Sequence, residues 1–67
     1  MIIQINGKQM EIPNDVTTVE GLLHHLQLET KIVVVEKNNV ILEKKAHQDT
    51  TVFEGDQIEI VTFVGGG

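Results

Sequence analysis

Hydrophobic and polar residues alternate at the start of the chain, on either side of an Asn-Gly pair. The segment IIQINGKQMEI holds Asn6 and Gly7 between two alternating runs. Asn-Gly favours a type I′ turn, because both central residues of that turn need positive φ, so the pattern predicts a β-hairpin. A two-residue turn gives the cross-strand pairs Ile5 with Lys8, Ile3 with Met10 and Met1 with Ile12. In this register the apolar partners share one face of the hairpin, and the polar side chains share the other.

A helical spacing replaces the alternation after Pro13, which ends the second strand. Thr17 and Glu20 stand at the spacing of a capping box, in which each side chain satisfies a free backbone N–H at the helix start. Apolar residues then recur at intervals that place them on one helix face: Val19, Leu22, Leu23 and Leu26. This pattern predicts one amphipathic helix over about residues 18–27.

The second half of the chain returns to strand patterns. KIVVVE is expected to form a buried strand, with NVILEK as its neighbour across a turn at residues 37–39. The polar segment KKAHQDT is expected to be a connection. A turn at Glu54–Gln57 then precedes a last strand, which we expect from Ile58 to about Val64.

The last strand carries apolar residues on both faces, with Ile58 and Ile60 on one and Val61 and Phe63 on the other. Such a strand is usually interior to a sheet, so we expect it in mid-sheet, next to the first strand. The order β-β-α-β-β, with one helix over one sheet face, predicts an α+β roll with a mixed sheet of four to five strands. We expect one domain over residues 1–64 and a flexible glycine tail over 65–67.

Composition narrows the possible partners and the compartment. A chain of 67 residues allows one domain, and such a short chain buries only about 60% of its unfolded surface. Ten acidic residues against five lysines give a formal charge of −5, which would repel nucleic acid, and the sequence contains no tyrosine or tryptophan on which bases could stack. We expect no membrane segment, since the longest apolar run has four residues. The absence of cysteine fits a cytoplasmic protein.

The side chains that carry most enzyme chemistry are absent or dispersed. His24 and His25 are adjacent, so on a helix they point about 100° apart and cannot share a metal ion, and His47 is distant in sequence. The glutamates are spread over every element, which is typical of a solvated surface rather than an acid–base pair. Serine and cysteine are both missing, and the one glycine cluster has no helix after it to bind phosphate. We therefore expect no catalytic residue and no metal site.

The three glycines after the last strand need an explanation, since glycine loses the most entropy on ordering and has no side chain to pack. A frayed terminus or a linker would each account for them. However, INGK, TVEGLLHHLQL, VVVEKNNVI, EGDQIEIV and the final VGGG occur in an order that resembles the sulfur carrier proteins of thiamin biosynthesis. These are ubiquitin-like β-grasp domains, and the resemblance covers nearly the full chain. It implies that the glycines are functional.

The resemblance also implies a mechanism and a set of partners. A ubiquitin-activating-like adenylyltransferase would use ATP to adenylate the carboxylate of Gly67, and a sulfur donor such as a cysteine desulfurase would convert it to a thiocarboxylate, a covalent 1-thioglycine. Thiazole synthase would then accept the sulfur. The chain itself would bind no cofactor. Gly65 and Gly66 would thread a channel too narrow for other residues, since three extended residues span at most ~10 Å.

The docking surface is predicted from the last strand. If the helix covers Ile58 and Ile60, no second element of this short chain is available to cover Val61 and Phe63, so we expect these two residues, with Val64, to contact the partner enzymes. Alternation alone leaves open that they belong to the core. Three other functions also stay open: the small subunit of molybdopterin synthase, a protein-conjugating ubiquitin-like modifier, and a binding domain whose glycines are inert.

Overall fold

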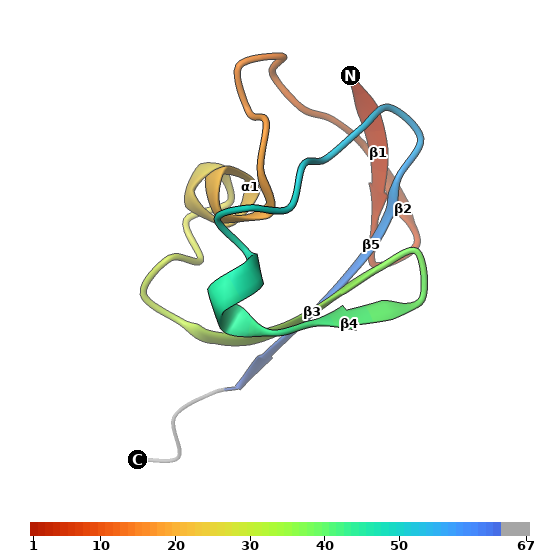
Figure 1. Ribbon diagram of the computed structural model, residues 1–67. Coiled ribbons are helices and arrows are strands. Elements are labelled where there is room, and N and C mark those ends of the chain that lie inside the picture. The colour runs from red at the N-terminus through yellow and green to blue at the C-terminus, as the bar shows by residue number, and fades with distance from the viewer. Residues whose placement is uncertain (64–67) are drawn as a thin grey trace.

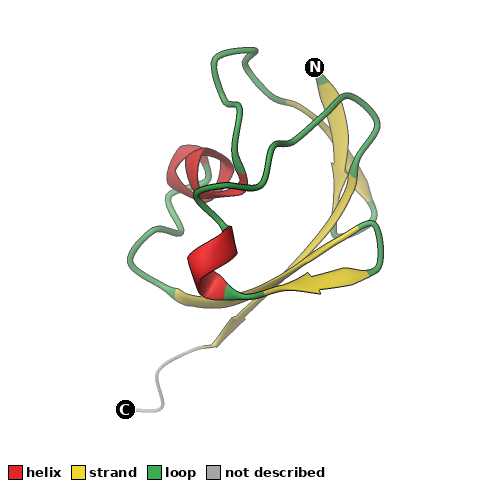
Figure 2. Ribbon diagram, viewed as in Figure 1, coloured by secondary structure: helices red, strands yellow, loops and turns green. Residues whose placement is uncertain are grey.

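The computed structural model describes residues 1–63, which form one mixed sheet with a helix on one of its faces (Figures 1 and 2). The sheet has five strands in the order β2-β1-β5-β3-β4. The elements are β1 (Ile2–Ile5), β2 (Lys8–Glu11), α1 (Val19–His25), β3 (Ile32–Lys37), β4 (Val40–Leu42), the 3-10 helix η1 (Lys44–Ala46) and β5 (Gln57–Phe63). The predicted α+β roll with one main helix is confirmed, and the sheet has the larger of the two expected strand numbers.

The first hairpin has the predicted turn and register. Asn6 and Gly7 both have positive φ, 54° and 81°, as a type I′ turn requires. Residue pairs along β1 and β2 include Ile5 with Lys8 and Ile3 with Met10. Beyond the strand ends, Ile12 N–H donates to the Met1 carbonyl at 2.8 Å, and the Met1 ammonium donates to the Ile12 carbonyl at 2.9 Å. The alternation in the sequence was therefore sufficient to fix the hairpin.

Helix α1 is shorter than predicted and begins one residue later. Its N-cap is Thr18, whose side chain accepts a hydrogen bond from Gly21 N–H at 3.0 Å, so the assignment of the cap to Thr17 was wrong. Two threonines in succession offer the same capping chemistry, and sequence does not distinguish them. The helix ends in a Schellman motif: Gln27 has φ of 61°, and Leu28 N–H donates to the Leu23 carbonyl at 2.8 Å. This motif turns the chain towards β3.

The second half of the sheet places the last strand at its centre, as predicted. β5 runs parallel to β1 and antiparallel to β3, and β3 pairs with β4 across a turn in which Asn38 and Asn39 have φ of 49° and 71°. β5 begins at Gln57, and the turn before it closes with a hydrogen bond from Asp56 N–H to the Phe53 carbonyl. Both features lie one residue earlier than expected.

The prediction that KIVVVE forms a buried strand was wrong for most of β3. Val35 is fully buried, but Ile32 is 73% exposed and Val34 is 39% exposed. The cause is the length of the chain. The described residues supply one helix and one 3-10 helix, both packed on the inner face, so the outer face of β3 stays in contact with solvent.

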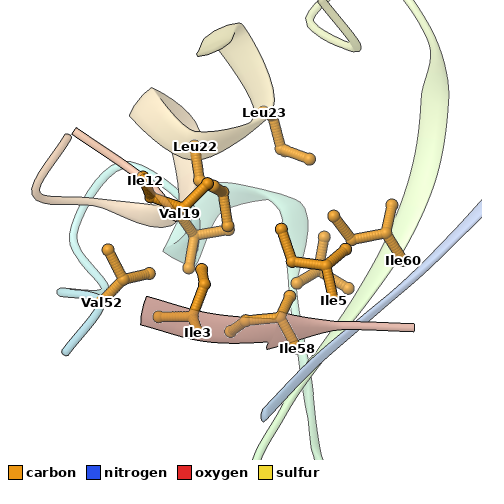
Figure 3. Packing of buried hydrophobic residues seen from close by; sticks show 10 residues of the cluster. Ile3, Ile5, Ile12, Val19, Leu22, Leu23, Val52, Ile58 and Ile60 are labelled. Atoms are coloured by element: carbon orange, nitrogen blue, oxygen red, sulfur yellow. The ribbon is translucent and has the colours of Figure 1, made fainter. Parts of the chain in front are cut away.

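The hydrophobic core lies between α1 and the inner face of the sheet (Figure 3). Val19 and Leu22 of the helix meet isoleucines from β1 and β5, and no large side chain at the centre is more than a few per cent exposed. The buried apolar residues are Ile3, Ile5, Ile12, Val19, Leu22, Leu23, Val35, Val52, Ile58 and Ile60. Neither helix in the described part of the chain is long and apolar enough to cross a membrane.

Candidate functional site

Strand β5 carries the predicted docking residues on the face of the sheet opposite α1. Ile58 and Ile60 point into the core and are 1% and 7% exposed, whereas Val61 and Phe63 are 57% and 55% exposed. The alternative that Val61 and Phe63 belong to the core is therefore wrong. Val64, Gly65, Gly66 and Gly67 lie outside the residues that the structure describes.

Neighbouring strands extend this exposed apolar surface beyond what the sequence predicted. The register of β3 against β5 pairs Val34 with Val61 and Ile32 with Phe63, which puts all four on the same face. Ile41 of β4 is 68% exposed and lies on that face too, opposite Glu36. These five residues, Ile32, Val34, Ile41, Val61 and Phe63, are called the outer-face patch below.

The sequence contained a signal for the additional members of the outer-face patch, but it was hidden by an uninterrupted apolar run. In β3 the side chains of Ile32 and Val34 must point away from the face that holds Val33 and Val35. Because all four are apolar, the alternation that reveals an exposed face in β5 is absent here. Knowing that β3 pairs with β5, and in which register, was needed to place Ile32 and Val34 beside Phe63 and Val61.

Two carboxylates border the outer-face patch. Glu36 of β3 pairs directly with Glu59 of β5 on the same face, and Glu59 is exposed. Like charges placed directly opposite destabilise an isolated sheet. A cation on the partner, next to the partner's own apolar surface, would relieve this repulsion. The charge pattern therefore favours a partner whose surface is apolar with a basic margin.

Side-chain amides hold β5 in place at both ends of its buried part. Asn6 pairs with Ile60 as a backbone strand would: Ile60 N–H donates to Asn6 Oδ1 at 2.7 Å, and Asn6 Nδ2 donates to the Ile60 carbonyl at 3.1 Å. At the other end, Gln57 N–H donates to Asn38 Oδ1 at 3.0 Å. Asn38 in turn donates to Asp56, a buried carboxylate. The strand that carries Val61 and Phe63 is thus fixed by contacts that do not depend on them.

The histidines do not form a metal site. His24 and His25 are exposed on α1, while His47 is buried after η1 and is only 6% exposed. Among residues 1–63, no three His, Asp or Glu side chains are close enough together to hold a metal ion.

The five-stranded mixed sheet with one helix over a single face defines a ubiquitin-like β-grasp domain. The chain belongs to the ThiS family, whose profile matches residues 3–67. The family match includes the four residues that the structure does not describe.

Curated and solved relatives agree with the family assignment. The sulfur carrier protein ThiS of Bacillus subtilis is 44% identical over 66 residues, which cover 98% of this chain and 100% of that protein. A crystal structure of the thiamine biosynthesis protein ThiS from Geobacter metallireducens superposes with a TM-score of 0.83 at 36% identity and covers both chains completely. A thiazole synthase of Paramagnetospirillum magneticum is 39% identical over all 67 residues, which make up 20% of that longer protein.

Proposed function

We propose that this protein carries sulfur as a thiocarboxylate on Gly67. Its membership of the ThiS family makes it a sulfur carrier protein of thiamin biosynthesis rather than an enzyme. The observation that supports the proposal most directly is the outer-face patch, because its residues Val61 and Phe63 lie on β5, the last strand before the glycines in the sequence. The patch gives a partner enzyme a surface to hold while it acts on Gly67.

Activation of Gly67 needs a partner because an ionised carboxylate is a poor electrophile. In the proposed first step a carboxylate oxygen attacks the α-phosphorus of ATP, pyrophosphate leaves, and an acyl-adenylate forms. A sulfur donor such as a cysteine desulfurase, which carries its sulfur as a persulfide, then attacks the carbonyl carbon with the terminal sulfur, and AMP leaves with the displaced oxygen. A thiol reductant attacks the donor's cysteine sulfur in the resulting acyl disulfide, forms a disulfide with it and releases the thiocarboxylate. The absence of cysteine from the chain agrees with sulfur being carried on the terminal carbon. The enzyme that catalyses adenylation is proposed to be a ubiquitin-activating-like adenylyltransferase.

In the proposed site, the residues that bind the partner enzyme are separate from the residue that reacts. The outer-face patch would seat the adenylyltransferase, and Val64 would extend the contact beyond Phe63. Gly65 and Gly66 would then pass through a channel to the active site, since they lack the Cβ atoms that would widen the chain. In this scheme residues 1–64 are the folded carrier domain, and residues 65–67 are the segment that enters the active site of the partner.

Thiazole synthase is the proposed acceptor of the sulfur. Proteins named thiazole synthase in Paramagnetospirillum magneticum and Magnetococcus marinus each contain a region similar to this entire chain, at 39% and 37% identity. A carrier-like region joined covalently to a thiazole synthase supports the view that the two surfaces work together. The same outer-face patch is proposed to meet both partners in turn.

The docking role is tested by a matched pair of exposed valines. Val61 is 57% exposed on the outer face, and Val40 is 61% exposed but shares the opposite face with Lys37. With a purified adenylyltransferase and ATP, Val61→Gln should lower the rate of adenylation at limiting enzyme roughly tenfold, as loss of one well-packed interface side chain would. Val40→Gln should leave the rate unchanged. Equal rates for both variants would remove the outer-face patch from the mechanism.

A further inference from the structure

A groove of about 550 Å³ is lined by residues of α1, η1 and the start of β3. The Schellman motif that ends α1 folds Leu28 back towards Leu23, and η1 contributes Lys44 and Lys45 to the lining. The groove is lined by Glu20, Leu23, Leu28, Glu29, Lys31, Ile32, Val33, Lys44, Lys45, His47 and Gln48. These residues come from three separate segments of the chain, so the groove exists only in the folded protein.

The groove concentrates the positive charge of an acidic protein. Lys31, Lys44 and Lys45 line it, which is three of the five lysines in the chain, together with Glu20 and Glu29. The lining therefore sums to +1, and one of its lysines, Lys45, is also paired at 3.5 Å with Glu43, which lies outside the lining. The rest of the chain has two lysines and eight acidic residues, which give a formal charge of −6. A ligand with negative charge is attracted to this surface and repelled by the rest of the molecule.

Three apolar residues of the lining, called the floor of the groove below, are buried or half-buried: Leu23 is buried, and Leu28 and Val33 are half-buried. Ile32, at 73% the most exposed large apolar side chain described, belongs both to the groove and to the outer-face patch. Lysine side chains next to apolar side chains form a surface that suits an amphipathic anion better than a small inorganic anion.

His47 also lines the groove, and one of its two ring nitrogens has no hydrogen-bond partner among residues 1–63. The residue is 6% exposed, and this nitrogen, Nε2, is buried. Its backbone is well held, since His47 N–H donates to the Lys44 carbonyl and the His47 carbonyl accepts from Glu20 N–H. Buried polar atoms are rarely left unpaired in native proteins. An unpaired ring nitrogen in the lining of the groove is a feature that a bound ligand would explain.

We propose that this groove is a second docking site, which binds an acidic, amphipathic peptide segment of a partner protein. An apolar side chain of the segment lies on Leu23, Leu28 and Val33, and its carboxylates lie against the lysines of the rim. Nucleic acid is not the occupant, because its extended phosphate backbone would run into the surrounding charge of −6. A small inorganic anion is not the occupant either, because it would leave the apolar floor uncovered. The proposal goes beyond sulfur transfer and does not rest on it.

The test uses the full chain, labelled with nitrogen-15, and an acetylated and amidated probe peptide of sequence Glu-Leu-Glu-Glu-Leu-Glu. We expect the amide resonances of residues 28–33 and 44–48 to shift on titration, and the affinity to fall as salt is added. Two control peptides separate the contributions. Replacing leucine by alanine should weaken binding through loss of the floor contact, and replacing glutamate by lysine should abolish it.

A matched pair of lysines tests the charge. Lys44→Glu should weaken binding of the probe peptide about fivefold, whereas Lys8→Glu, which makes the same change in net charge on the first hairpin, should alter it by less than about twofold. Shifts confined to other surfaces, equal binding of the alanine peptide, or equal effects of the two substitutions would each overturn the proposal. Inorganic phosphate that produces the same shifts at the same concentrations would replace it with a simple anion site. None of these measurements involves thiocarboxylate formation, so the proposed function stands or fails separately.

Discussion

The substitution Phe63→Ala distinguishes between two roles of Phe63 that the sequence left open, a docking residue and a core residue. Phe63 is 55% exposed, so a little less than half of its surface is removed from water. Burying a whole phenylalanine side chain stabilises a protein by about 1.5–3 kcal/mol, and alanine is less favourable than phenylalanine in a strand by up to about 1 kcal/mol. The expected loss in the free energy of unfolding is therefore about 1–2 kcal/mol.

A core position of the same strand provides the comparison. Ile58 is 1% exposed, and Ile58→Ala should cost about 2–5 kcal/mol because a cavity is left in the core. Urea denaturation of the parent and both variants measures the two losses. In the same preparations, thiocarboxylate formation should fall for Phe63→Ala although the protein remains folded.

Two results would contradict the assignment of Phe63 as an exposed docking residue. A loss of about 3 kcal/mol or more for Phe63→Ala would mean that the ring is packed as a core side chain is. Unchanged kinetics of thiocarboxylate formation, measured with the adenylyltransferase below saturation, would mean that the ring is exposed but contacts no partner.

Three further predictions concern the fold and the glycines. Asn6→Ala removes both hydrogen bonds to Ile60 and should lower the free energy of unfolding by about 1–3 kcal/mol in urea denaturation; a loss below about 0.5 kcal/mol would show that water replaces them. Thr18→Ala should cost about 1 kcal/mol in the same assay through loss of the bond from Gly21 N–H, and Thr17→Ala, the control, should cost less. Gly66→Val should leave the melting curve within about 0.5 kcal/mol of the parent but slow adenylation, because it adds bulk next to the reacting residue. Adenylation at the parent rate would show that no narrow channel surrounds Gly66.

Those parts of the fold that depend on local patterns could be predicted from the sequence. Asn6-Gly7 fixed the hairpin register, and the apolar residues on both faces of the last strand placed it in mid-sheet beside β1. The exposure of Val61 and Phe63 followed from counting the elements available to cover the second face. Each of these inferences needed only periodicity and the short length of the chain.

Features that depend on distant contacts could not be predicted. The pairing of Asn6 with Ile60 joins residues 54 positions apart, and nothing in the local sequence distinguishes that asparagine from any other in a turn. The burial of His47 and the gathering of three lysines into one groove depend on how η1 packs against α1 and β3. The prediction that β3 is buried failed because an uninterrupted apolar run carries no sign of which face is covered.

The intact mass of the chain shows whether Gly67 carries the sulfur. The protein is incubated with the adenylyltransferase, ATP, a sulfur donor and a thiol reductant, and a variant that lacks Gly66 and Gly67 is treated in parallel. We expect the mass of the parent to rise by the difference between one sulfur and one oxygen atom, fragmentation to place this difference on Gly67, and the mass of the truncated variant to stay unchanged. A parent mass that stays the same, a sulfur atom located on any other residue, or a high-mass conjugate to lysine would contradict the proposal.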